Sequence, residues 1–133
     1  MQTYLLDTNH AGEVLKKESG GLKFPGSKAG ENIQLTLCYP SVAELWFMVH
    51  NSCRVSANIV SLRFFLTCFP IYSFDGRAAE EFGVISAQLR KLGRPIKAVD
   101  TQIAAIARVN GLTVLTADRH FSFIPGVKYE SWL

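Results

Sequence analysis

The sequence predicts an α/β fold with a mainly parallel sheet, and three observations support this prediction. The chain has 133 residues, a length typical of one domain. Hydrophobic residues make up 48% and charged residues 19% of it, which excludes a disordered or low-complexity chain. Short apolar runs alternate with longer segments whose apolar residues recur at helical spacing. We therefore expect one domain over residues 1–133.

The first half of the chain is predicted to begin with a short buried strand. Residues 4–6 form an apolar run that stops at Asp7. A helix at 8–18 follows, and the glycine and proline residues within 19–31 predict a loop. Further on we expect a strand at 34–39 and helices at 40–51 and 56–67, with Ser41 as the N-cap of the first of these helices.

The second half continues the alternation. A third strand is expected at 69–74, followed by the turn Asp75-Gly76 and a helix at 78–92 that Gly93 ends. Apolar residues at helical spacing predict another helix at 98–109, which Asn110-Gly111 terminates. A buried strand is then predicted at 112–115 and an edge strand at 127–132.

Composition also limits where the protein is expected in the cell and which structural sites it can contain. The longest apolar run, Leu45 to Val49, is far shorter than the roughly twenty residues of a membrane span. The N-terminus lacks the pattern of a secretory signal. Three cysteines without a Cys-x-x-Cys pair argue against a disulfide framework or a structural zinc site. We expect a cytoplasmic protein that does not enter a membrane.

In open parallel sheets, sites form beyond the carboxyl ends of the strands. Asp7, Glu44 and Asp118 map to such edges, and Asp100 falls in the first turn of the helix that precedes the last buried strand. All four could converge on one end of the sheet. Clustered carboxylates repel one another unless a cation lies among them, and hard oxygen ligands favour Mg²⁺ or Mn²⁺. Such a cation activates water and braces a phosphate, so the pattern indicates metal-assisted phosphodiester hydrolysis.

Each acid also has a purely structural interpretation. Asp7 before Thr8 could cap a helix, and Ser41-x-x-Glu44 fits a capping box. Asp100 in a first helical turn complements the helix dipole, and Asp118 could be an ordinary turn residue. The spacing alone leaves both interpretations open.

The motifs around these acids resemble a known family. They are Tyr4-Leu-Leu-Asp7-Thr8-Asn9, Pro40-Ser-Val-Ala-Glu44-Leu, the segment from Arg94 to Ala107 around Asp100, Gly111-Leu-Thr-Val-Leu-Thr116-Ala-Asp118-Arg-His-Phe121, Ile124-Pro-Gly-Val and Glu130-Ser-Trp132. In this order, and over nearly the whole chain, they resemble PIN-domain ribonucleases, in particular the VapC-type toxins of bacterial toxin–antitoxin pairs.

The resemblance implies a three-layer α/β/α fold, and an RNA endonuclease that a cognate antitoxin holds inactive. It also implies a dimer or a larger toxin–antitoxin complex. Within the acidic pocket, Asp7 and Asp100 are expected to ligate Mg²⁺ or Mn²⁺ directly, Asp118 directly or through water, and Glu44 to orient a water. Cleavage of RNA would leave a 5′-phosphate and a 3′-hydroxyl.

The sequence departs from the family at two places. Residues 19–31 are rich in glycine where a second helix often lies. His120 stands where the family often has another acid after Asp118, which removes one anionic ligand and favours a single metal ion.

Residues beside the acids are candidates for supporting roles. The Thr116 hydroxyl could fix a carboxylate or a metal-bound water, or Thr116 is simply a β-branched strand residue. Asn9 could hydrogen-bond Asp7 or the substrate, or act in a turn.

The charge balance outside the acidic pocket is positive. If four of the 11 acids line the pocket, seven remain outside it with the 14 Lys and Arg, which leaves an excess of about seven positive charges that suits a polyanion. The candidate RNA contacts are Arg90, Arg94, Lys97, Arg119 and His120, and the alternative for them is a solvated surface.

The aromatic residues Trp46, Phe47, Phe64, Phe65 and Phe69 are predicted to lie in the core or at a partner interface rather than to stack on bases. Helices 41–51 and 56–67 are where we expect an antitoxin or a second subunit to bind.

Four other functions compete with the toxin nuclease. A PIN nuclease of RNA processing fits the same residues, and so does an inactive PIN module that only binds protein or nucleic acid. A phosphatase with Asp7 as nucleophile requires a second acid where Asn9 stands, and a receiver domain requires an acid pair where Leu6-Asp7 gives one. A nucleotide-binding Rossmann fold is excluded because the sequence has no Gly-x-Gly-x-x-Gly or Walker loop.

Overall fold

A computed structural model describes residues 2–17 and 32–131. The segment 19–31, predicted as a glycine-rich loop, lies outside these residues. In the described part, five strands form one sheet in the order β3-β2-β1-β4-β5, and every pairing is parallel. The strands are β1 (Gln2–Leu6), β2 (Ile33–Cys38), β3 (Ile71–Tyr72), β4 (Thr113–Leu115) and β5 (Lys128–Glu130). The predicted parallel sheet is confirmed.

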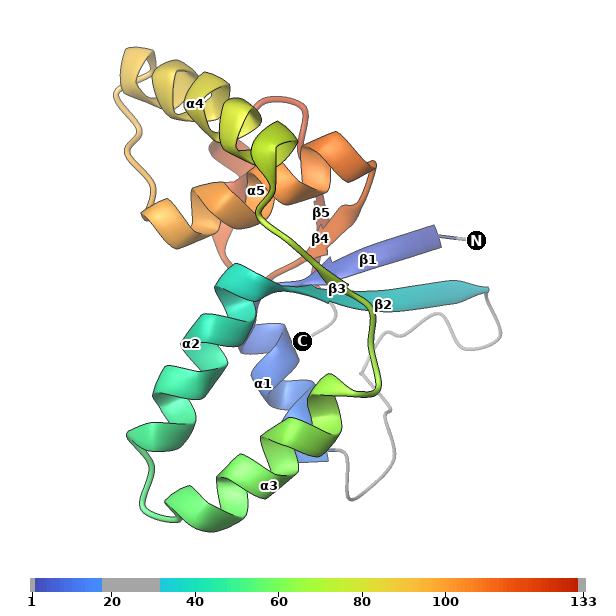
Figure 1. Cartoon of the computed structure of the whole chain (residues 1–133). Coiled ribbons are helices and arrows are strands. Elements are labelled where there is room, and N and C mark those ends of the chain that lie inside the picture. Colours follow the sequence, from blue (N-terminus) through green and yellow to red (C-terminus); the bar gives the residue numbers. More distant parts are fainter. Residues whose placement is uncertain (1, 18–31, 132–133) are drawn as a thin grey trace.

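Helices cover both faces of this sheet, so the fold has the three layers that the resemblance implied (Figure 1). On one face lie α1 (Thr8–Lys17), α2 (Tyr39–His50) and α3 (Val55–Leu66). On the other lie α4 (Gly76–Lys91) and α5 (Ala98–Asn110), packed along each other. A short 3₁₀ helix, η2 (Arg119–Phe123), follows β4 and was not predicted.

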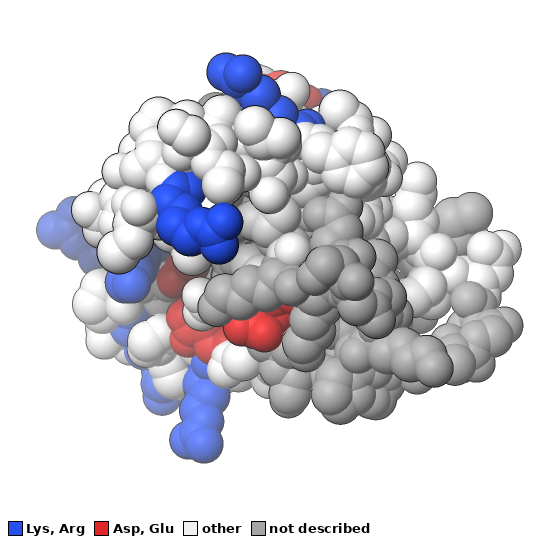
Figure 2. All heavy atoms as spheres, turned by 90° about the horizontal axis from the view of Figure 1, so that it is seen from below, with Lys and Arg blue, Asp and Glu red and all other residues white. Residues whose placement is uncertain are grey.

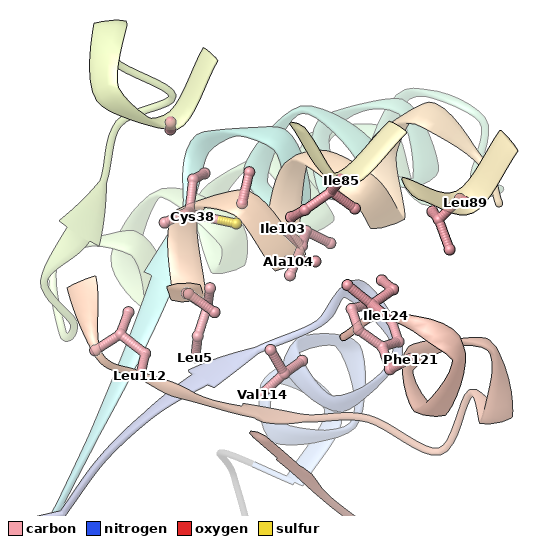
Figure 3. Packing of buried hydrophobic residues seen from close by; sticks show 14 residues of the cluster. Leu5, Cys38, Ile85, Leu89, Ile103, Ala104, Leu112, Val114, Phe121 and Ile124 are labelled. Atoms are coloured by element: carbon pink, nitrogen blue, oxygen red, sulfur yellow. The ribbon is translucent and has the colours of Figure 1, made fainter. Parts of the chain in front are cut away.

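Two hydrophobic cores form because successive strand residues point to opposite faces of the sheet. Tyr4 and Leu6 of β1 are fully buried on the side of α1, α2 and α3. Leu5, between them, is fully buried on the side of α4 and α5, where Figure 3 shows it near the residues of β4, α5 and η2. The near-continuous apolar character of β1 follows from this double burial.

Several predicted boundaries need correction. The strand expected at 69–74 contains only Ile71–Tyr72, and the edge strand at 127–132 only Lys128–Glu130. Ser41 was wrong as an N-cap, because β2 runs directly into α2 and the cap position falls on Cys38. The Ser41 hydroxyl instead lies 3.5 Å from Cys38 Sγ.

The ends of the later helices follow the sequence more closely. Gly93, which follows the C-cap Leu92 of α4, and Gly111, the C-cap of α5, adopt positive φ angles of 67° and 66°, as expected for helix-terminating glycines. Helix α4 begins two residues before the predicted start because the Asp75 carboxylate accepts a hydrogen bond from Ala78 N at 2.9 Å. None of the helices in the described ranges is long and apolar enough to cross a membrane.

The predicted core aromatics divide into two groups. Phe65 is fully buried, whereas Phe47 and Phe64 are 60% and 63% exposed. The prediction for the five aromatic residues was the core or a partner interface. The core is confirmed for Phe65, and Trp46 and Phe69 are partly buried against it. Phe47 and Phe64 lie outside the core, and for them the partner interface stays a prediction.

Candidate functional site

Asp7 and Asp118 lie at the same edge of the sheet because β1 and β4 are parallel neighbours. Asp7 directly follows β1, and its backbone N–H donates to Leu115 O of β4 at 3.1 Å. Asp118 lies three residues beyond the end of β4. The sheet thus brings together two carboxylates that are more than a hundred residues apart in the sequence.

Asp7 caps α1 and also faces the site. Its Oδ1 accepts a hydrogen bond from His10 N at 2.9 Å, which is the capping contact considered from the sequence. His10 Nδ1 lies 3.3 Å from the same oxygen, and the His10 side chain is fully buried. The capping interpretation is confirmed. Capping uses Oδ1 and not Oδ2, so it does not exclude a functional role for Asp7, which stays a prediction.

Glu44 lies one and a half turns into α2, and the capping box predicted for it with Ser41 does not form. Its Oε1 instead accepts a hydrogen bond from Thr8 Oγ1, at the start of α1. This contact ties the first turn of α1 to α2. It holds the Glu44 carboxylate next to the residue that follows Asp7.

Asp118 is held from both sides. Its Oδ1 accepts from His120 N at 2.9 Å and caps η2, and His120 Nδ1 lies 2.9 Å from that oxygen. Its own backbone N–H donates to Thr116 Oγ1 at 2.9 Å. Thr116 therefore positions the backbone of Asp118, while the hydroxyl contact to a carboxylate that we considered is not among the hydrogen bonds of the described residues.

Asp100 reaches the site from the first turn of α5, as predicted. Burial raises the pKa of its carboxyl above the ordinary value, and the negative charges of Asp118, Glu44 and, more weakly, Asp7 raise it further. Lys97 acts in the opposite direction. Asp118, Glu44 and Asp7 therefore lie close enough to Asp100 for their negative charges to add to the effect of burial.

All four acids line one open cavity of about 560 Å³ at the carboxyl edge of the sheet. Seen from below the view of Figure 1, acidic side chains gather in a patch with Lys and Arg on the surrounding surface (Figure 2). The lining residues are Asp7, Thr8, Asn9, Pro40, Ala43, Glu44, Phe47, Met48, Lys97, Val99, Asp100, Gln102 and Asp118.

The donor set fits a hydrated hard cation. The acids offer only carboxylate oxygens, and the oxygens Oδ2 of Asp7 and Asp118 receive no hydrogen bond from the described residues. Across residues 2–17 and 32–131, no three acidic, histidine or cysteine side chains are placed to hold one ion by themselves. Mg²⁺ does not need such a cage, because it keeps several waters and takes only one or two protein carboxylates.

The predicted RNA contacts are only partly brought to the cavity. Lys97 and Asn9 line it. The Arg94 guanidinium instead stacks 4.3 Å from the ring centre of Phe123, and Arg90 lines a separate cavity beside the end of α4. Arg119 and His120 are exposed near Asp118 and do not line the cavity.

Sequence reasoning missed four residues of the site. Thr8 and His10 contact Glu44 and Asp7, and Phe47 and Met48 line the cavity. The last two follow Glu44 by three and four residues, which is the spacing of neighbours on one helix face and the signal that could have identified them. No comparable pattern marks His10 as buried.

Known proteins resemble this chain in sequence and in fold. The family model of the PIN domain matches residues 4–126. The chain is 30% identical to Ribonuclease VapC2 of Haemophilus influenzae, with 100% of both chains covered. It is 28% identical to the tRNA(fMet)-specific endonuclease VapC of Shigella flexneri, with 99% of both covered. A chain of the crystal structure of DNA-bound VapBC from Salmonella typhimurium superimposes with a TM-score of 0.83 at 26% identity, with 100% of both chains covered. The chain belongs to the PIN-domain family.

Proposed function

We propose that this chain is a metal-dependent endoribonuclease, the toxin of a toxin–antitoxin pair, and that Asp7, Glu44, Asp100 and Asp118 form its active site. It is a nuclease of the PIN-domain family with VapC ribonucleases as full-length relatives. The observation that carries the site assignment is the convergence of four carboxylates from distant segments on one cavity, with a raised pKa at Asp100. Residues 1–133 act as one catalytic domain in this proposal.

The cofactor is a divalent cation, as is general for this family, and we propose Mg²⁺ or Mn²⁺. When bound, such an ion supplies an activated water and positive charge for the scissile phosphate. Asp7 and Asp100 would hold it directly, and Asp118 would hold it directly or through a water. The buried contact of Asp7 with His10 N fixes the Asp7 carboxylate before an ion binds, which lowers the cost of ordering it.

The substrate is RNA, cleaved to leave a 5′-phosphate and a 3′-hydroxyl. Glu44, held by Thr8, accepts a hydrogen bond from the attacking water and orients it. Lys97 at the rim of the cavity neutralises a phosphate of the bound strand. The name of the Shigella flexneri relative makes tRNA the first substrate class to test.

The partner is a cognate antitoxin, in a hetero-oligomer or with a toxin homodimer, and the complex acts in the cytoplasm. Solved relatives are VapBC complexes. Helix α3 carries exposed apolar side chains, Val60 and Phe64, on the layer that also contains α1 and α2. Such a surface suits a protein partner.

The test is cleavage of structured RNAs by the purified chain with Mg²⁺ or Mn²⁺, with EDTA as the metal-free control. We expect metal-dependent cutting that Asp100→Asn reduces by more than about 100-fold, because loss of a ligand costs more than the 10–100-fold loss of an outer contact. Glu80→Gln is the matched control, because Glu80 is exposed on α4 outside the cavity. No cutting by the folded, metal-loaded, antitoxin-free protein would favour a module that only binds its partners.

A further inference from the structure

Helix α2 presents a second stripe, apolar except for Glu44, in addition to the face that it buries. The buried face contains Ser41, Val42, Leu45 and Val49. The second stripe recurs at the spacing i, i+3, i+4, i+7 and i+8, which places its members on one side of the helix. Its members are Pro40, Ala43, Glu44, Phe47 and Met48, and all of them line the acidic cavity.

Phe47 is the largest exposed group of this stripe. Its side chain is 60% exposed, and it lies one helical turn beyond Glu44. An isolated exposed aromatic residue is ordinary on a protein surface. This ring, however, shares the cavity with four carboxylates and with Lys97, so any strand whose phosphate reaches the carboxylates passes close to it.

We propose that Phe47 is a stacking platform for one base of the RNA substrate, with Met48 as the adjoining apolar contact. This inference rests on the proposed function and specifies its substrate class. Sequence-specific recognition of RNA mostly targets unpaired nucleotides, whose bases stack on aromatic side chains. The substrate is therefore RNA with an unpaired nucleotide beside the cleaved bond, because a base inside a duplex is already stacked.

The size and charge of the cavity agree with this role. Its volume of about 560 Å³ lies within the range of clefts that hold small organic ligands, so a single nucleotide fits. Lys97 supplies a positive charge for the neighbouring phosphate. The apolar wall formed by Pro40, Ala43 and Phe47 offers no hydrogen bonds to a base edge, so it favours contact with the face of the base.

The test compares Phe47→Ala, Phe47→Leu and Phe47→Trp on a short RNA hairpin that the wild-type chain cleaves in its loop. We expect Phe47→Ala and Phe47→Leu to lower kcat/KM by roughly 10- to 100-fold, the range for loss of one base-stacking contact. Phe47→Trp should retain cleavage. Mn²⁺ binding, followed by electron paramagnetic resonance, should stay unchanged in all three. Tyr129→Ala, which removes a 45% exposed aromatic residue of β5 outside the cavity, is the matched control.

An abasic nucleotide identifies the base involved. Placed at the stacked position, it should lower kcat/KM of the wild-type chain by a similar factor and have little further effect on Phe47→Ala. Such non-additivity is the mark of a direct contact.

Four outcomes would overturn the inference. They are wild-type kcat/KM for Phe47→Ala, full retention by Phe47→Leu, equal cleavage of a continuous duplex and of the loop, and loss of antitoxin binding by Phe47→Ala with cleavage intact. The last outcome would assign Phe47 to a protein interface. If the wild-type chain cleaves no RNA at all, the proposed function itself fails, and this result is distinct from the other four.

Discussion

The site contains two aspartate–histidine pairs of the same chemistry, one buried and one partly exposed to solvent. Asp7 and His10 meet at 3.3 Å, with side chains 7% and 0% exposed. Asp118 and His120 meet at 2.9 Å, with side chains 32% and 58% exposed. In each pair the aspartate directly caps a helix through Oδ1. The pairs differ in exposure because α1 packs against a face of the sheet, whereas His120 lies on η2 at the surface of the protein.

This difference shows that distance alone does not measure the importance of a contact. Water competes with the shorter contact, and even a fully charged pair at an exposed position contributes only between zero and about 1 kcal/mol. The longer pair lies in a core where a group that loses its partner cannot turn to solvent. We therefore expect Asp7 and its contacts to be fixed, and Asp118 and its contacts to adjust when metal or substrate binds.

The largest expected effect separates the two aspartates. Asp7→Asn should reduce metal-dependent RNA cleavage by more than about 100-fold, because the buried site cannot recruit another ligand in its place. Asp118→Asn should cost less, about 10- to 100-fold, because a water can substitute at its exposed position. Single-turnover cleavage rates at saturating Mn²⁺ would measure both. Equal losses would remove the distinction between a fixed and an adjustable carboxylate.

The second effect separates the two histidines. His10→Ala should lower the free energy of unfolding by about 2–4 kcal/mol, because it leaves a cavity and removes a buried contact of Asp7. His120→Ala should change it by less than about 0.5 kcal/mol. Urea denaturation of the metal-free proteins tests this.

His10→Gln shows whether His10 also positions Asp7. If it does, Mn²⁺ affinity falls by about 10- to 100-fold in the variant even where the fold is intact. Unchanged Mn²⁺ affinity in a folded His10→Gln protein would reduce His10 to a packing residue.

The smallest effect concerns Asp100, which lines the same cavity as the two aspartates and interacts with the charge of each. Its pKa is raised in the folded chain, so the folded state binds this proton more tightly than the unfolded state. Stability of the metal-free protein should therefore fall as pH rises from the ordinary value near 3.8 through the folded pKa, and stay constant above it.

Asp100→Asn removes this destabilising charge. The melting temperature of the metal-free protein at neutral pH should rise, by roughly 3–6 °C for each kcal/mol of relieved repulsion. Adding Mn²⁺ should stabilise the wild-type chain more than the variant. A variant that melts lower than the wild type at neutral pH would contradict the assigned cause of the raised pKa.

The sequence alone predicted the parallel α/β fold and the convergence of Asp7, Glu44, Asp100 and Asp118. An apolar run that ends in an acid can be recognised in the local sequence. Because the carboxyl ends of parallel strands meet at one edge of the sheet, such acids are predicted to lie close together. Whether these four residues perform the reaction stays a prediction.

The tertiary structure decided the contacts that depend on which surfaces meet. The Glu44 carboxylate accepts a hydrogen bond from Thr8 instead of forming a capping box with Ser41, because α1 lies against α2. His10 is buried and Phe47 exposed, although both are on helices with apolar neighbours. Helical periodicity defines the faces of a helix, but only the packing of the other elements determines which face is covered.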